Sequence, residues 1–262
     1  MTATVLAASE PLVDWAWVGD RLDEVREMAV EHVKLTVLAV AIGFAIAMGM
    51  ALISLRWRWT YAVLAGFCGV LYAIPSVALF GVLLPITGLG LVPAQIALVG
   101  YTLLILLRNI VAGIDGVPVA VREAADGMGY ERWRRLLRID LPLALPTIIA
   151  GLRIATVTTV GLVTVTALIG EGGFGDWINE GLSRQFSTQV IVGTIGSIVL
   201  AVVFDLLFVG LERVAAPWAR KDGIRRQRVH RGRGDPANVP VDVPVDVVAD
   251  VPVPVGGSVV GG

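Results

Sequence analysis

Charged residues are scarce in this chain. Asp, Glu, Lys and Arg make up 16% of its 262 residues, whereas a soluble domain carries about 25%. Apolar residues make up 56%, and the mean hydropathy is +0.78. This composition disfavours a soluble enzyme and predicts a protein that crosses a membrane several times. The net charge of −1 says nothing about partners by itself; we expect a lipid bilayer around the chain and no nucleic-acid partner.

Cysteine and histidine are almost absent. The single cysteine, Cys68, lies in an apolar run, so no intrachain disulfide can form. His32 and His230 stand far apart in the sequence, and no Cys/His metal-binding spacing occurs. The chain also lacks a GxxxxGK(S/T) phosphate-binding loop. We therefore expect no metal, no catalytic residue and no nucleotide hydrolysis in this chain.

Long apolar runs are abundant instead. A helix needs about 20 apolar residues to cross the hydrocarbon core. Backbone groups in lipid have no water to bond, so such runs form helices. The sequence therefore predicts an all-α membrane protein with about five transmembrane helices. The expected spans are residues 35–55, 61–84, 91–107, 147–169 and 190–211.

The segment before the first span, residues 1–34, has acidic residues where a secretory signal would be apolar. Apolar residues recur every three to four positions over residues 15–33, which predicts an amphipathic helix. Trp15 and Trp17 suit the headgroup level of a membrane. Two interpretations are open: the helix lies on the membrane surface, or it packs on the protein's own loops.

Basic residues are distributed unevenly between the two sides of the predicted spans. If residues 117–146 lie in the cytoplasm, that side carries 16 Lys and Arg and the other side carries 4. The positive-inside rule then places the N-terminus outside and the C-terminus in the cytoplasm. Residues 212–262 form a tail that is first basic and then rich in Pro, Val and Asp, and we expect it to be disordered.

The longest interval between spans, residues 117–146, predicts two short helices, over 119–128 and 131–138. Gly129 permits the positive φ that a turn between them needs. The small side chains of Ala124 and Ala125 would let the groove of another protein approach the backbone. We expect Arg122 and Glu123 to supply polar contacts at the rim of that interface.

Seven positions in this loop have a fixed spacing, Glu123-Ala124-Ala125, Gly129, Ile139 and Leu141-Pro142. The spacing resembles the EAA loop of ABC-importer membrane subunits, the cytoplasmic element that docks on the ATPase. Other segments resemble the osmoprotectant branch of these permeases, namely residues 74–76, 88–90, 107–109, 127–129, 141–146, 169–175 and 181–182. Two residues depart from the branch pattern: Glu171 replaces a small residue, and Phe174 replaces a common Leu.

The resemblance implies a MetI-like permease fold in the cell membrane. It also implies three kinds of partner: ABC ATPase subunits, an extracytoplasmic substrate-binding protein, and a second permease subunit that is either identical or a paralogue. ATP and Mg would be bound by the ATPase, so this chain would not be an enzyme. Glu123, Ala124, Ala125 and Gly129 would then carry coupling, the transfer of motion that produces alternating access.

Pro75 and Asp205 are candidates for the substrate pathway. Pro75 lies inside the second span and would kink it into a gate, although prolines in spans are often packing features only. Asp205 lies in the last span, where an ionisable residue faces either a partner or an aqueous cavity. For Asp205, local hydrogen bonding or reaching toward the inner surface is the alternative.

The glycine-rich segment at residues 170–181 is a candidate outer gate. It contains Gly172, Gly173, Gly175 and Trp177. The segment would re-enter the membrane or contact the binding protein. The alternative is a merely flexible connector.

The function that these features predict is the permease of an ATP-driven importer for an osmoprotectant such as glycine betaine, choline, carnitine or proline betaine. The first rival is the same machine for a different solute, such as methionine, taurine or nitrate. The second rival is an ATP-independent secondary transporter or channel, and the third is a membrane enzyme.

Overall fold

A computed structural model describes residues 12–217 of the chain, and every regular element in that part is helical. The helices are α1 (Trp15–Gly19), α2 (Leu22–Arg56), α3 (Trp59–Ala73), α4 (Ser76–Thr87), α5 (Leu91–Asp115), α6 (Val119–Gly127), α7 (Arg132–Arg135), the π-helical η1 (Leu136–Asp140), α8 (Leu141–Thr166), the 3-10 helix η2 (Ala167–Ile169), α9 (Phe174–Arg184) and α10 (Ser187–Ala215). The all-α class is confirmed. Most of the predicted disordered tail lies outside the described residues.

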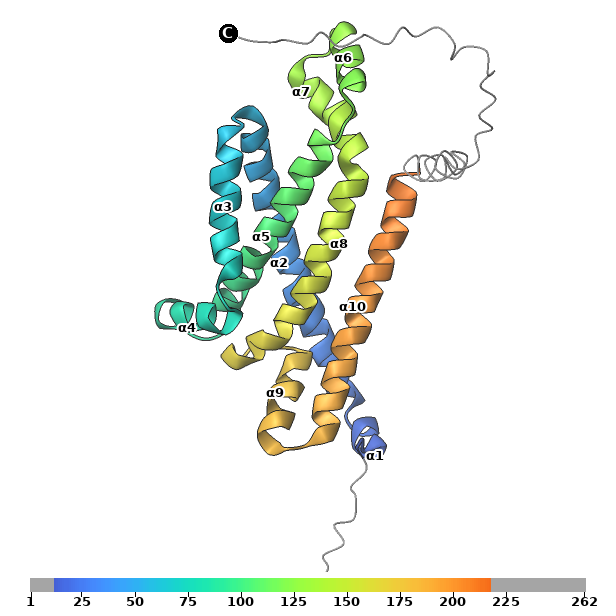
Figure 1. Ribbon diagram of the computed structural model, residues 1–262. Coiled ribbons are helices and arrows are strands. Elements are labelled where there is room, and N and C mark those ends of the chain that lie inside the picture. Colours follow the sequence, from blue (N-terminus) through green and yellow to red (C-terminus); the bar gives the residue numbers. More distant parts are fainter. Residues whose placement is uncertain (1–11, 218–262) are drawn as a thin grey trace, which may run out of the picture. The chain divides into compact units, whose positions relative to one another are not determined.

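Four helical runs are long and apolar enough to cross a membrane: α2, α5, the run Arg132–Ile169, and α10. A fifth span exists only if α3 and α4 count as one, because the two are bent by 95°. The second span expected at residues 61–84 is therefore two helices, and the kink expected at Pro75 is a sharp bend between them. Figure 1 shows α4 lying crosswise at the end of α3.

The bend at Pro75 follows from proline chemistry. Proline has no backbone N–H and disfavours the helical conformation in the residue before it. Accordingly Ile74 is extended, with ψ 127°. The hydroxyl of Tyr101 donates a hydrogen bond to the carbonyl of Ile74, and Leu79 N–H donates to the Pro75 carbonyl at 3.0 Å as α4 begins. The bend therefore leaves these two backbone carbonyls with donors.

The first span and the segment before it form one helix. α2 runs without a break from Leu22 to Arg56, so the boundary expected near residue 35 is absent. The N-terminal third of α2 contacts the protein itself: Glu31 accepts from Gly173 N–H at 3.2 Å, and His32 Nε2 lies 3.0 Å from the Val160 carbonyl oxygen. The structure therefore shows the packing on the protein's own loops that was one of the two interpretations.

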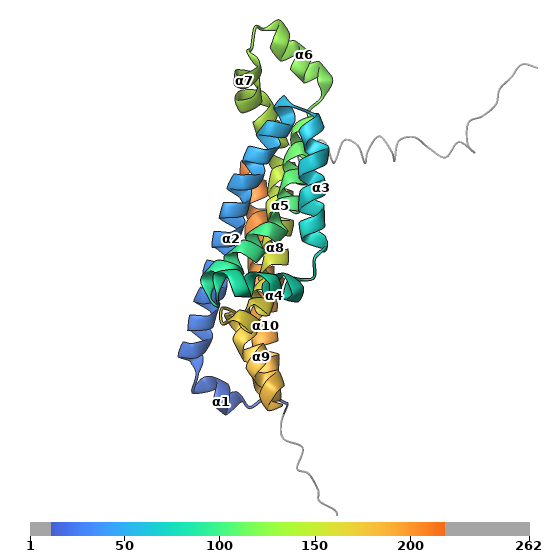
Figure 2. The ribbon, with the colours of Figure 1, turned by 90° about the vertical axis from the view of Figure 1, so that its left-hand side faces the viewer.

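The core is organised around α5, which contains more buried residues than any other described helix. In both ribbon views α5 lies between α2, α3 and α8 (Figures 1 and 2). Gly43 of α2 permits the closest approach, because a Cβ there would lie 1.9 Å from Thr102 Oγ1. Small residues let membrane helices pack at short range. The small side chains of α2 therefore set its distance from α5.

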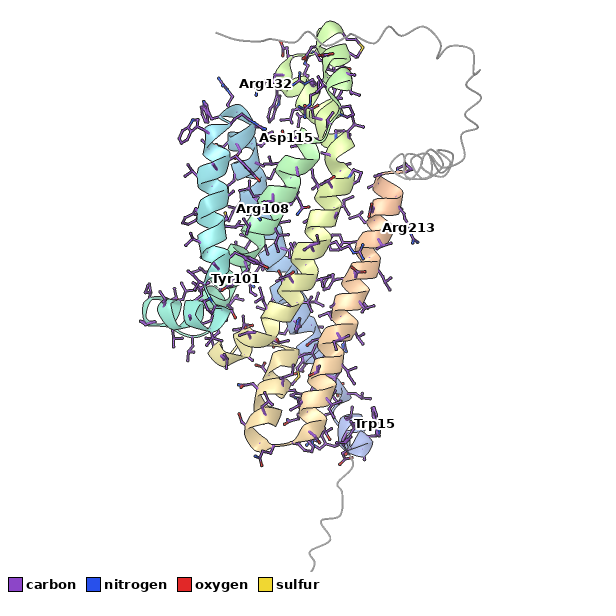
Figure 3. The ribbon with its side chains drawn as sticks, viewed as in Figure 1. Trp15, Tyr101, Arg108, Asp115, Arg132 and Arg213 are labelled. Atoms are coloured by element: carbon purple, nitrogen blue, oxygen red, sulfur yellow. The ribbon has the colours of Figure 1, made fainter. Side chains whose placement is uncertain are left out.

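The predicted spans are shorter than the helices that contain them. α5 continues past residue 107, where its span was expected to end, as far as Asp115; Figure 3 shows Arg108 along the helix. The fourth span does not begin at residue 147, because helix is continuous from Arg132. α10 extends beyond residues 190–211 at both ends. Hydropathy detects the lipid-facing part of a helix but not its polar extensions.

Candidate functional site

The loop between α5 and α8 begins with the short helix α6. Pro118 precedes α6, with φ −56° and ψ 137°. At the other end, Gly129 has φ +79°, its N–H donates to the Asp126 carbonyl, and Tyr130 N–H donates to the Ala125 carbonyl. This hydrogen-bond pair is the Schellman pattern, which favours glycine at the left-handed position. The predicted first helix and the turn at Gly129 are confirmed.

The second short helix is not separate from the fourth span. α7, η1 and α8 follow one another directly, so the helix end expected at residue 138 is absent. Pro142 has no N–H to donate to Arg138, and Pro146 is also inside α8. Leu141 N–H donates instead to the Leu136 carbonyl, five residues back. The π-helical turn thus carries the loop into α8 as one continuous lever.

A charge network ties α6 to the base of α8. Asp140 is 4% exposed and lies between two guanidinium groups, 3.7 Å from Arg122 Nε and 3.5 Å from Arg135 Nε. Arg135 also contacts both carboxylate oxygens of Asp126 at 2.6 Å. The contacts with Asp126 are charge-assisted hydrogen bonds, which are stronger than neutral ones. Asp140 is held by ion pairs, and its Oδ1 has no hydrogen-bond partner among the described residues. Asp140 is therefore the buried hub of this loop.

Two predicted docking residues face inward instead. Arg122, expected at a rim, pairs with Asp140 and donates to the Ile114 carbonyl near the end of α5. Ala125 is 1% exposed, so its small size serves packing within the loop. Glu123 and Ala124 are exposed as expected.

The outward face of α6 and its turn is partly apolar. Val119 and Met128 are 67% and 68% exposed, and Glu123 and Ala124 lie between them in sequence. Ile139, Leu141 and Pro142, by contrast, are half-buried where the loop joins α8. Of the seven spaced positions, three are therefore exposed at the tip, Ala125 is buried there, and the remaining three pack at the base.

The sequence analysis missed several residues that hold this loop. They are Asp126, Asp140, Arg132, Arg135, and the pair formed by Arg58 and Asp115. The pair joins the α2–α3 turn to the end of α5 through two hydrogen bonds, of 3.0 and 2.9 Å. The available signal was an acidic residue, Asp140, placed directly before Leu141-Pro142 among several arginines.

At the opposite end of the helices, the glycine-rich segment is packed. Gly173 has φ +51°, and a Cβ on Gly175 would lie 2.3 Å from the Thr164 carbonyl oxygen. Trp177 is 2% exposed, and its ring centroid lies 5.1 Å from that of Trp17. The alternative of a flexible connector is therefore wrong. Gly172, also buried, joins the others in this packed turn.

The two residues that depart from the expected pattern also lie here. The ring of Phe174 packs where Gly196 of α10 has no side chain, since a Cβ there would lie 2.6 Å from the ring. Glu171 is half-buried. Nearby, burial first and then the charge of Glu31 raise the pKa of Asp176 to about 6. This end of the molecule therefore carries a carboxyl group whose pKa lies well above its usual range.

The two substrate-pathway candidates are not brought together. Pro75 forms the bend between α3 and α4. Asp205 of α10 pairs with Arg153 of α8, with Arg153 Nη2 2.7 Å from Asp205 Oδ2 and Nε also in contact. Asp205 was predicted as a candidate without this partner. Their contact makes Asp205 a partner in an interhelical ion pair.

Comparison with known proteins shows the family to which the chain belongs. Residues 40–217 match the model of the binding-protein-dependent transport system inner membrane component. The chain belongs to this family. It is 33% identical over 203 residues to the osmoprotectant import permease protein OsmW of Salmonella typhimurium, covering 76% of this chain and 94% of OsmW. It is also 33% identical to the glycine betaine/carnitine/choline transport system permease protein OpuCB of Bacillus subtilis, over 71% of this chain and 86% of that one.

Solved structures agree on the fold of this inner membrane component. A chain of the MetNI methionine ABC transporter in an inward-facing conformation superposes with a TM-score of 0.67 at 18% identity, covering 75% of this chain and 98% of that one. At this identity the likeness concerns the fold alone. The MetI-like permease fold, the multi-pass membrane location and the transport class are therefore established, and the predicted resemblance is confirmed.

Proposed function

We propose that this permease imports an osmoprotectant of the quaternary-ammonium type, such as glycine betaine, choline or carnitine. The observation that carries the proposal is the 33% identity to two permeases whose names state osmoprotectant and glycine betaine/carnitine/choline transport. The likeness to the methionine transporter concerns the fold only, so it does not favour methionine as the solute.

The energy for import comes from a separate ATPase that binds ATP and Mg. Its docking surface is the outward face of the loop, formed by Val119, Glu123, Ala124 and Met128. Behind this surface, Asp140 and its two arginines join α6 to α8. A displacement of α6 is therefore transmitted to the membrane helix α8 and is not absorbed by a flexible loop. The residues at the tip supply coupling, and catalysis belongs to the ATPase.

The loop faces the cytoplasm in this proposal. Arg56, Arg58 and Arg213 lie at helix ends that the alternation of spans assigns to the loop's side, while Arg21 and Arg184 belong to the other side. The positive-inside rule favours the arginine-rich side as cytoplasmic. The packed turn with Trp177 then faces outward, toward an extracytoplasmic binding protein. A second permease subunit, identical or paralogous, completes the translocation pathway.

Uptake by the reconstituted complex tests this function. The permease, its ATPase and its binding protein are placed in liposomes with ATP inside, and radiolabelled glycine betaine, choline, carnitine or methionine is added outside. We expect ATP-dependent accumulation of at least one quaternary-ammonium solute and none of methionine. Accumulation of methionine alone would overturn the solute class, and ATP-independent flux through the permease alone would overturn the ATP-driven mechanism.

The ATPase-coupling role is tested separately with Glu123→Arg. The side chain is exposed, so the substitution leaves membrane insertion intact while it reverses the charge on the docking face. We expect uptake to be lost and the permease to stay in the membrane fraction. Arg138→Glu, an exposed charge reversal in the same loop, is the matched control.

A further inference from the structure

A basic cleft lies beneath the coupling loop, where the apolar parts of the helices end. Its volume is about 640 Å³. The floor is apolar and includes Leu52, Leu55 and Ile114. Arginines from three different segments line its sides: Arg56 ends α2, Arg58 follows in the α2–α3 turn, and Arg132 begins α7.

The charges of this cleft are not balanced within the described residues. Arg58 is neutralised by Asp115. Arg122 and Arg135 are balanced by Asp140 and Asp126. Arg132 donates only to the Leu55 carbonyl, at 2.8 Å. Arg56 contacts the ring of Trp57 and has no carboxylate partner in the part of the chain described. The cleft therefore presents two uncompensated positive charges above an apolar floor.

The cleft is placed at the level of lipid headgroups. Trp57, in the turn beside it, and Trp59, at the start of α3, are 53% and 71% exposed. Tryptophan is enriched where a membrane meets water. Residues 35–55, which end at the cleft, carry no charge. Figure 3 shows Arg132 and Asp115 at this end of the helices, near the α2–α3 turn. A ligand here can reach both the hydrocarbon and the water.

We propose that this cleft binds an anionic phospholipid, with the phosphate-bearing headgroup held by Arg56 and Arg132 and an acyl chain over the apolar floor. Arginine is well suited to phosphate because its planar guanidinium offers several donors. A free phosphate is also anionic but gains nothing from Leu52 and Leu55. The cleft at the other end of α2 mixes three acidic side chains with Arg26 and Lys34, so it lacks this preference. The site is independent of which solute is transported.

Native mass spectrometry of the full-length permease tests the proposal. The protein is released from mixed phosphatidylglycerol and phosphatidylcholine micelles, and the lipids that stay bound are counted. We expect retention of phosphatidylglycerol over phosphatidylcholine. Arg56→Gln should weaken this retention about fivefold, since a basic residue at an anionic membrane surface contributes about 1 kcal/mol and 1.4 kcal/mol is a factor of ten.

The matched control is Arg134→Gln, an exposed arginine of α7 that does not line the cleft. We expect it to retain phosphatidylglycerol as the wild type does. Arg132→Gln is the second variant, and its thermal unfolding is compared with that of Arg134→Gln to separate lost binding from a loosened loop. An equal loss in Arg56→Gln and Arg134→Gln, or no preference in the wild type, would overturn the proposal.

A competition arm distinguishes lipid from soluble anion. Glycerophosphoglycerol, which is the headgroup without acyl chains, and inorganic phosphate are added at millimolar concentration. We expect neither to displace bound phosphatidylglycerol. Full displacement by either compound would reassign the cleft to a soluble phosphate and contradict the role of the apolar floor.

Discussion

Replacing Asp140 by Ala removes the hub of the coupling loop. The carboxylate is 4% exposed and faces Arg122 and Arg135 at 3.7 and 3.5 Å. Breaking a fully buried ion pair costs about 3–5 kcal/mol. The two arginine side chains keep 26% and 18% of their exposure, and Arg135 keeps its contact with Asp126, so we expect a smaller loss of about 2 kcal/mol. That loss raises the population of open loop about thirtyfold.

Limited trypsin digestion in detergent measures this population, because cleavage of a locally opened segment follows the open fraction when reclosing is fast. Trypsin cuts after arginine, and the loop offers Arg132, Arg134 and Arg138. We expect Asp140→Ala to be cut about thirty times faster than the wild type at these sites. Glu131→Ala, an exposed acid beside α7, should be cut at the wild-type rate. Equal cleavage rates for Asp140→Ala and Glu131→Ala would refute the claim that Asp140 holds the loop closed.

Three further predictions concern the turn, the interhelical pair and the outer end. Gly129→Ala should destabilise the loop by about 1 kcal/mol because φ is +79°, and trypsin should detect this, whereas Gly127→Ala, with open space at its Cβ, should not differ from wild type. Arg153→Asp and Asp205→Arg should each lower the melting temperature, and the double charge exchange should recover part of the loss; no recovery would contradict the pairing. Because burial raises the pKa of Asp176 from about 3.8 to about 6, the folded state holds an extra proton between these values. Stability should therefore fall as pH rises through this window, and Asp176→Asn should abolish that dependence in thermal melts.

Hydropathy was sufficient to predict the all-α membrane class, and the motif spacing was sufficient to predict the family. Each depends on local sequence: a run of about 20 apolar residues crosses a bilayer wherever it stands. The turn at Gly129 was also predictable, because a left-handed residue after a short helix is a local requirement. The bend at Pro75 was only half predictable. Proline marked the place, but the 95° angle depends on how α4 packs on α5.

The inward side of the loop could not be predicted in the same way. Arg122 and Asp140 are 18 positions apart, and only the path of the chain through η1 brings them together. Arg153 and Asp205 are 52 positions apart in the sequence and pair between two helices, α8 and α10. A single sequence reports that such charges exist but does not report which ones pair. The packing of the glycine-rich segment could not be predicted for the same reason, since its glycines lie close to α2, α8 and α10.

The central claim is that the outward face of α6 receives the ATPase. Cross-linking from single cysteines tests it directly, since the native Cys68 is buried and contributes little background. A short photoreactive group is attached at Ala124→Cys, Met128→Cys or, as the control at the other end of the chain's helices, Arg184→Cys. The account predicts ATPase adducts from positions 124 and 128 and none from 184. Adducts from 184 alone, or from no position in an assembled complex, would contradict it.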